Sequence, residues 1–162
     1  MAAAVIDATF EGAAANSYNT VAEGIAYFEI RPGGDLWVDL DLEEQRATLL
    51  FALIMIERET FWGLQGTTTQ ALQFPRTGMV VIPTEVKHAQ LEQALHLADG
   101  GFLKQQQFIE SQSQGVREIA AGDTRVRMIP THPDGFASYQ LAPQTRQLLS
   151  GYIEVGVRMG RA

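Results

Sequence analysis

The residues best suited to direct chemistry are the carboxylates of one short acidic stretch, GGDLWVDLDLEE. Hard cations such as Mg²⁺ and Ca²⁺ prefer oxygen ligands of this kind. However, the leucines interrupt the calcium-loop pattern, which needs a glycine at its sixth position and a glutamate at its twelfth. Carboxylates before and inside the first turn of a helix also offset the helix dipole. We therefore favour helix capping over a metal site for this set: Asp35, Asp39, Asp41, Glu43 and Glu44.

The histidines form no recognisable metal or catalytic set. His88 and His96 are eight residues apart, which places them about 80° apart around a helix. Zinc-binding pairs on a helix prefer a spacing of four, and His132 stands alone. The chain has no cysteine, and it lacks the glycine-rich phosphate-binding and serine-hydrolase motifs. We expect no nucleophile–base pair, no metal, no cofactor and no enzymatic activity.

The stretch QALQFPRTG places apolar residues directly before an arginine. One interpretation is a stacking platform for single-stranded bases, made by Phe61, Trp62, Phe74 and Arg76. The other is a structural latch, in which Leu72 and Phe74 cover a helical bundle. Arg76 would then bond loop carbonyls or a neighbouring subunit.

The charge distribution bears on this choice. The chain of 162 residues has a formal net charge of −7, whereas a nucleic-acid-binding protein is usually basic. Residues 1–110 carry 15 acidic and 6 basic residues, and residues 111–162 carry 4 acidic and 6 basic residues. An acidic body with a mildly basic tail suggests two surfaces facing different partners, although chance explains so few charges equally well. On charge grounds we favour the latch.

Two capping boxes predict where the first helices begin. Thr20 with Glu23 begins a helix that ends at RPGGD, and Asp41 with Glu44 begins a second. The second helix is apolar on nearly every side, and we expect it to run from Leu42 to Trp62, about 30 Å. We interpret it as the buried central helix of a bundle. A long connection over residues 63–82 follows it.

The second half of the chain is expected to mix helix and hairpin. A helix capped by Thr84 carries the apolar stripe Leu91, Ala94, Leu95 and Ala98. At about residues 115–129 the apolar period changes around AAGD, which indicates a β-hairpin. A short last helix begins near Pro143. The predicted outward positions of the hairpin are basic: Arg117, Arg125 and Arg127.

These elements predict a mainly α protein, a small helical bundle around a buried central helix, with a β-hairpin and an extended C-terminal tail. We expect an N-terminal arm over residues 1–16, a helical domain over 17–153 and a tail over 154–162. No secretory signal is expected, because the N-terminal stretch lacks basic residues. The longest apolar run, around Leu49–Ile56, is too short for a membrane span.

The ordered set of segments resembles a known family. NSYNTVAEGIAYFEIR, Trp37, ATLLFALIMIERETFWG, QALQFPRTG and IPTEVKHAQLEQALHLA occur in this order, followed by GVREIAAGDTRVRM and APQTRQLLSGYI. Together they are similar to the head–tail connector (adaptor, head-completion) proteins of long-tailed bacteriophages. Some members of that family carry the label of a DnaT-like single-stranded-DNA-binding protein. The resemblance covers about residues 16–153.

The resemblance implies a structural adaptor of the virion neck, assembled in the host cytoplasm. It implies a dodecameric ring between the portal protein and a further neck or tail-terminator protein, with DNA as passing cargo. An acidic lumen would repel the DNA backbone and let it slide. A single-stranded-DNA-binding replication accessory is the alternative. A Gly-interrupted tail could order on a partner through five residues: Val155, Val157, Arg158, Met159 and Arg161.

Overall fold

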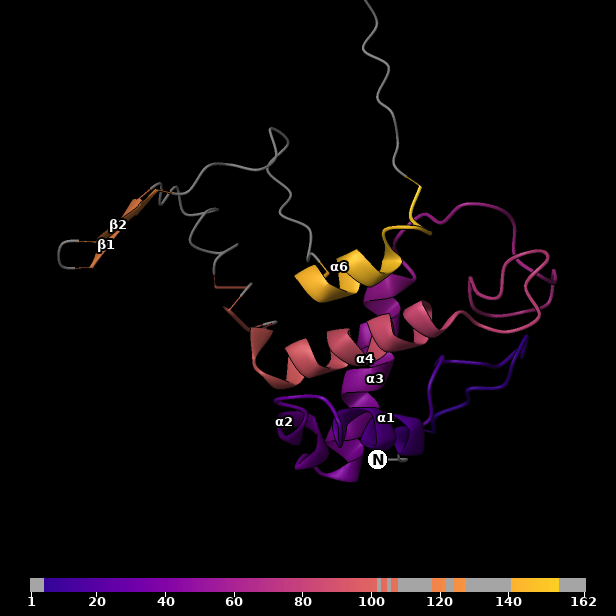
Figure 1. The fold of residues 1–162 in the computed structure, drawn as a ribbon, viewed down its shortest axis with the longest axis horizontal. Helices are drawn as coiled ribbons and strands as arrows, with labels where there is room; N and C mark the ends of the chain where they lie inside the picture. The colour runs from indigo at the N-terminus through magenta and orange to yellow at the C-terminus, as the bar shows by residue number, and fades with distance from the viewer. Residues whose placement is uncertain are drawn as a thin grey trace, which may run out of the picture. The chain divides into compact units, whose positions relative to one another are not determined.

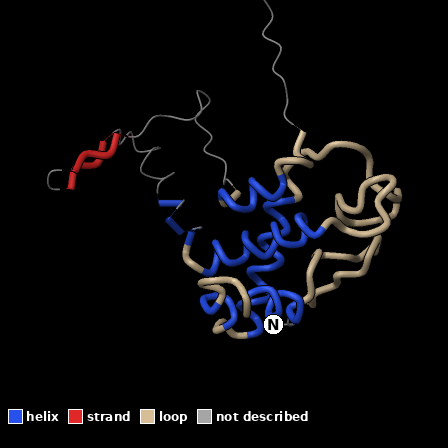
Figure 2. Tube along the Cα trace, viewed as in Figure 1, coloured by secondary structure: helices blue, strands red, loops and turns tan. Residues whose placement is uncertain are grey.

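The computed structural model describes residues 5–101, 103–104, 106–107, 118–121, 124–127 and 141–154. The chain divides into two compact units, Met1–Asp99 with Leu141–Ala162, and Gly100–Gln140. The first unit is built from helices and long loops (Figures 1 and 2). The prediction of a mainly helical protein is confirmed.

Both predicted capping boxes are present. Helix α1 (Val21–Phe28) begins at Thr20, whose side chain accepts a hydrogen bond from Glu23 N at 3.2 Å. The Glu23 carboxylate in turn accepts from Thr20 N at 2.7 Å. The reciprocal pair satisfies amide groups that have no partner within the first turn, so the helix start is fixed locally.

The short helix α2 (Asp35–Val38) carries Trp37 into the core. Its indole Nε1 donates a hydrogen bond to Thr48 Oγ1 at 2.9 Å. A buried tryptophan needs such a partner for its polar edge. This bond ties α2 to α3 (Leu42–Ile56), which begins at the predicted Asp41 and Glu44 capping box.

Helix α3 is shorter than the sequence predicts. It ends at Ile56 and not at Trp62, so it is about 22 Å long. The Gln73 side-chain amide donates to the carbonyls of Glu57 and Glu59, both at 2.9 Å. Beyond them, Phe61 forms an antiparallel bridge with Ile153, near the end of the described chain. Contacts with distant segments therefore replace the last helical turns.

Helix α4 (Thr84–Ala98) occupies the centre of the unit and packs against α2, α3 and α6 (Pro143–Leu149) (Figure 1). The prediction that α3 is the central helix is wrong in this respect, although one side of α3 is buried. Thr84 is also not the cap: it is the first helical residue, and Pro83 precedes it without a side-chain cap bond. Helix α6 begins at Pro143, as predicted.

A buried amide explains how α4 can be central while looking polar. Gln90 Oε1 accepts from Tyr18 N at 3.0 Å and from Asn19 Nδ2 at 2.9 Å. Its Nε2 donates to Ser17 Oγ at 2.9 Å and to the carbonyl of Leu49 at 3.0 Å. Because every polar atom of this amide is paired, its burial is tolerated. Gln90 joins the N-terminal segment and α3 to one turn of α4.

The core consists of two neighbouring apolar clusters. One joins α1, α2 and α3 to the second half of α4, and its members are Phe28, Trp37, Leu49, Ala52, Leu91, Ala94 and Leu95. The other joins α3, α4 and α6 to the loop that follows α3. Its members are Ala15, Tyr18, Leu53, Met55, Ile56, Phe61, Leu72, Phe74, Val86, Ala89, Leu141 and Leu149. This loop is therefore a structural part of the fold.

The second unit contains two described strands. β1 (Glu118–Ala121) pairs antiparallel with β2 (Thr124–Arg127), with Glu118 opposite Arg127. Only the backbone of these eight residues is described, and they form a two-stranded ribbon within the described ranges. The side chains of the predicted hairpin surface lie outside the described residues, so the basic surface stays a prediction.

Candidate functional site

The loop between α3 and α4 is organised by its own side chains. Gln70 is buried, and its Nε2 donates to the carbonyls of Leu72 at 2.7 Å and Pro75 at 3.0 Å. Its Oε1 accepts from Thr67 N at 2.9 Å. A single glutamine thus supplies bonds that a regular element would supply through its backbone. The result is a fixed loop, which can present residues in a defined geometry.

Arg76 lies inside this loop with 8% of its surface exposed. Its Nε donates to the carbonyl of Trp62 at 2.9 Å, and its Nη2 donates to the carbonyl of Phe61. The guanidinium carbon lies 5.9 Å from the ring centre of Phe61 and 5.8 Å from that of Phe74. The planar fork of an arginine suits this combination of paired carbonyls and aromatic faces. The positive charge of Arg76 is therefore paired with carbonyls and aromatic rings of the same chain.

The residues of the proposed stacking platform are mostly inaccessible. Phe61 and Phe74 are buried and contact each other edge to face, with ring centres 5.0 Å apart. Arg76 is covered as well, and Trp62 alone of the four is exposed. Stacking requires free aromatic faces. Leu72, Phe74 and Arg76 all turn their side chains to the buried side of the loop, as the latch hypothesis expects. A role of the latch in assembly stays a prediction.

A second buried polar group adjoins Arg76. The Tyr18 hydroxyl donates to the Glu57 carboxylate, and Gln73 N donates to the other carboxylate oxygen at 2.9 Å. Phe74 N donates to the Tyr18 hydroxyl at 3.3 Å. These bonds hold the Gln73–Phe74 backbone against the end of α3. Since one partner comes from each of three segments, the cluster fixes the loop to the helical body.

Burial dominates the titration of this pair. Burial raises the pKa of Glu57, and the hydrogen bonds from Tyr18 and Gln73 and the charge of Arg76 oppose that rise only in part. Burial also raises the pKa of Tyr18, and the neighbouring Glu57 carboxylate adds to the effect. The phenol therefore keeps its proton and donates a hydrogen bond to the carboxylate. The pair is suited to holding structure and not to transferring protons.

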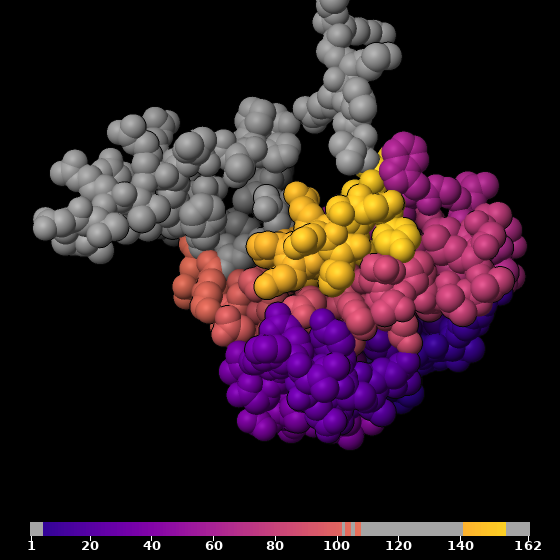
Figure 3. Space-filling view, viewed as in Figure 1, coloured from indigo at the N-terminus to yellow at the C-terminus, as the bar shows by residue number. Residues whose placement is uncertain are grey.

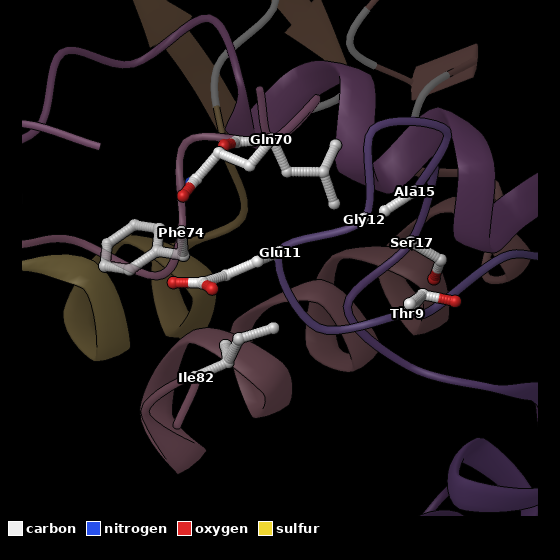
Figure 4. Close-up of a pocket in the computed structure, with 9 residues that line it drawn as sticks. Thr9, Glu11, Gly12, Ala15, Ser17, Gln70, Phe74 and Ile82 are labelled. Carbon is white, nitrogen blue, oxygen red and sulfur yellow. The ribbon is translucent and has the colours of Figure 1, made fainter. Parts of the chain in front are cut away.

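The N-terminal segment packs on the same loop. Ala71 N donates to the carbonyl of Gly12 at 3.1 Å. Figure 4 shows Glu11 extending from this segment toward Phe74 and Ile82, which line a narrow cleft between the segment and the loop. The cleft leaves no room for a water molecule, so it is not a ligand site. The part of the predicted arm that is described, residues 5–16, belongs to the first unit and contacts its α3–α4 loop.

The acidic stretch serves the helices. Asp41 and Glu44 form the α3 capping box, and Glu43 pairs with Arg46 at 2.9 Å. Asp35 lies in the first turn of α2. In the described part of the chain, no three acidic or histidine side chains are placed to hold a metal ion.

An ion pair between the partly exposed Arg31 and the buried Glu92 was not foreseeable from the sequence. Arg31 Nε and Nη2 donate to the two oxygens of Glu92 at 2.6 and 2.7 Å, and the Tyr27 hydroxyl donates at 2.7 Å. Burial by itself would raise the pKa of Glu92, but the hydrogen bonds from Arg31 and Tyr27 and the charge of Arg31 outweigh it and lower the pKa. His88 packs against the Tyr27 ring, with ring centres 4.6 Å apart. Partners 61 residues apart share no local spacing that could have revealed them.

A family model described as "Putative DnaT-like ssDNA binding protein" matches residues 2–130. The chain belongs to this family. No curated protein and no solved structure matches. The DnaT-like match covers α1 to α4, the loop latch and both strands, and it ends before α6.

The remaining predicted site residues of this DnaT-like chain lie outside the description. Arg117 is not described, and only the backbone of Arg125 and Arg127 is described, within β2. The predicted partner-binding tail, Val155, Val157, Arg158, Met159 and Arg161, also falls outside the described residues. Over the described ranges, no helix is both long enough and apolar enough to cross a bilayer.

Proposed function

We propose that this chain is a structural adaptor subunit of a bacteriophage neck. In this proposal, copies form a dodecameric ring that joins the portal protein to a further neck or tail-terminator protein. DNA passes through the ring as cargo, and the subunit is located in the virion neck after assembly in the host cytoplasm. The resemblance of the ordered sequence segments to head–tail connector proteins suggests this function.

The observation that carries the proposal is the use of the loop residues. Phe61, Phe74 and Arg76 are buried, and Arg76 contacts both aromatic rings and donates to backbone carbonyls of the loop. These side chains therefore stabilise the loop and are not available to bases. A rigid loop costs little ordering entropy when it contacts another protein. This is the property that a building block of a symmetric assembly needs.

The charge of the chain supports the same choice. Residues 1–110 carry 15 acidic against 6 basic residues. Binding to a nucleic acid gains most of its affinity from neutralised phosphates, and this surface offers few cations. In a ring, an acidic wall would repel the DNA backbone and allow it to move through.

A single-stranded-DNA-binding replication accessory is the second candidate. The description of the family names that activity, and Trp62 is an exposed aromatic side chain that could stack on a base. Fluorescence anisotropy with a labelled oligonucleotide at low salt separates the two. The adaptor proposal expects little binding, whereas tight, salt-sensitive binding that Trp62→Ala weakens would favour the accessory.

The decisive experiment locates the subunit in finished particles. Electron microscopy of purified virions should place a ring of this chain at the neck, next to the portal. Mass spectrometry of the same particles should detect the chain at a constant ratio to the portal protein. Absence from purified particles would refute the adaptor proposal. A metal-dependent enzyme that uses the acidic stretch is a weaker option, which an unchanged melting temperature on adding Mg²⁺ or Ca²⁺ would count against.

A further inference from the structure

Helix α3 is covered on one side only. Its buried residues contribute to both core clusters or lie beside them, and they are Gln45, Leu49, Ala52, Leu53, Met55 and Ile56. In the view of Figures 1 and 3, α4 lies in front of α3 and packs on it. The opposite side, here called the outer face of α3, carries residues spaced by four, three and four positions, which places them within about 60° of arc. They are Glu43, Ala47, Leu50 and Ile54.

The outer face is largely apolar although it is accessible to solvent. Ala47 is exposed, Ile54 is 48% exposed, and Leu50 is half-buried. Only Glu43, in the first turn, is charged. The solvent side of a surface helix is usually polar, and apolar residues at this spacing are typical of a helix face that another segment covers.

The described chain ends beside the C-terminal end of this helix. Glu154 N donates to the carbonyl of Thr60 at 2.8 Å, and Thr60 follows the last residue of α3 by four positions. Trp62 N donates to the carbonyl of Tyr152 at 2.9 Å, so both bonds fix the position of residues 152–154. The residues that follow Glu154 therefore start within reach of the outer face.

The sequence after Glu154, here called the tail segment, matches the outer face in pattern and length. In an extended chain alternate residues point to one side, and alternate positions of the tail segment hold Val155, Val157, Met159 and Arg161. The seven residues from Glu154 to Arg161 span about 23 Å when extended, and α3 is about 22 Å long. Three apolar residues can thus follow the outer face, and the arginine then lies at the level of the first turn.

The charges are complementary as well. Residues 155–162 carry two arginines and no acidic residue, whereas residues 1–110 carry 15 acidic and 6 basic residues. The first turn of α3 holds Glu43 and Glu44, and Asp41 precedes them. A basic segment is attracted to this end of the helix, whereas a second acidic copy of the chain would be repelled.

We infer that the tail segment docks on the outer face of α3 in the same chain. Val157 packs on Ile54, close to the end of the helix. Arg161 pairs with Glu43 in the first turn. The docked segment covers the residues that the sequence predicts to bind a partner, so a partner has to displace them from α3. This regulatory consequence rests on the proposed function, whereas the docking itself does not.

Two introduced cysteines can report this contact, because the chain has none of its own. The test pair is Ile54→Cys with Val157→Cys, and the control pair is Ser150→Cys with Val157→Cys. Ser150 is exposed and is much closer to Val157 along the chain than Ile54 is. A freely moving tail segment would therefore meet Ser150 at least as often as Ile54, because closing a shorter loop costs less entropy.

Disulfide formation in a glutathione buffer, at low protein concentration, is followed by non-reducing electrophoresis and mass spectrometry. We expect the test pair to form a disulfide within one chain at least tenfold faster than the control pair. Equal rates, or a faster control pair, would overturn the inference. A test pair that links only two separate chains would also overturn it, and would assign the outer face to the tail segment of another copy.

A charge reversal tests the arginine contact. Glu43→Lys in the test pair should slow disulfide formation at least threefold, because Arg161 then meets a like charge, and added salt should reduce this difference. Glu29→Lys is the matched control, because Glu29 is also exposed and follows α1, outside the outer face. A rate that Glu43→Lys leaves unchanged would refute the ion pair.

Particle analysis separates this inference from the proposed function. If the chain is found in virions but the test pair does not link preferentially, the docking fails while the adaptor role stands. If the test pair links within one chain but the chain is absent from virions, the adaptor role fails while the docking stands.

Discussion

Removing the Arg76 side chain tests whether the loop latch carries stability. In Arg76→Ala, the carbonyls of Phe61 and Trp62 lose their donors, and two aromatic rings lose a cation. The third bond, to the carbonyl of Gln73 at 3.4 Å, is long and adds little. A hydrogen bond to a charged group contributes about 1.5–3 kcal/mol. Two such bonds give an expected loss of about 3 kcal/mol or more.

This loss is large compared with a net stability of about 5–15 kcal/mol for a typical domain. For a chain of this size, about 3 kcal/mol lowers the melting temperature by about 6–12 °C. Thermal and urea denaturation followed by circular dichroism would measure it. Arg58→Ala is the matched control, because Arg58 is exposed and its loss should cost less than about 0.5 kcal/mol.

Arg76→Lys separates the charge from the geometry of the guanidinium. A lysine keeps the positive charge, but its single ammonium group cannot reproduce the planar fork that reaches both carbonyls. We expect an intermediate loss of about 1–2 kcal/mol. The affinity for a labelled oligonucleotide should not change in either variant. A melting temperature of Arg76→Ala equal to that of wild type, with normal assembly into particles, would refute the latch.

Three further substitutions test other parts of the structure. Burial raises the pKa of Glu57 above its ordinary 4.5, so the fold favours the protonated carboxyl. The stabilisation from this preference is present below about pH 4.5 and is lost as the pH rises through the folded pKa. Urea titrations at a series of pH values should show this fall in wild type and not in Glu57→Gln. The pKa of Glu92 is lowered because the bonds and charge of Arg31 outweigh burial, so its contribution is present above pH 4.5 and is lost as the pH falls through the folded value. Glu92→Gln should cost about 2 kcal/mol at neutral pH and progressively less in acid, and a constant difference would contradict the pairing. In Gly24→Ala the new Cβ would lie 2.9 Å from Trp37 Cη2. Overpacking of this kind costs about 1–3 kcal/mol, which should exceed the gain in helix propensity of about 1 kcal/mol and leave a net destabilisation. An unchanged melting temperature would show that the indole can move.

Local rules predicted the helix starts well and the helix ends poorly. The boxes at Thr20 and Asp41 need only residues three positions apart, and both are present. The end of α3 depends on Gln73, which reaches back to the carbonyls of Glu57 and Glu59. Periodicity cannot detect such a contact, because the competing partner comes from another part of the chain. The apolar run to Trp62 therefore predicts continued helix where the structure has none.

The candidate site was predictable in part for the same reason. The alternation of Leu72 and Phe74 before Arg76 indicated a loop packed on the bundle, and both apolar side chains are buried. Which carbonyls the arginine would bind depends on the fold and could not be derived. The central position of α4 could not be predicted, because Gln90 looks like a surface residue in the sequence. In the structure it is buried with all of its polar atoms paired.

Residues 100–140 form an insertion whose two ends, after Asp99 and before Leu141, both attach to the first unit. The entropic cost of closing such a connection grows only with the logarithm of its length, and doubling the length adds about 0.6 kcal/mol. The closure of this connection should therefore change the stability of the helical body little if the insertion becomes longer or shorter.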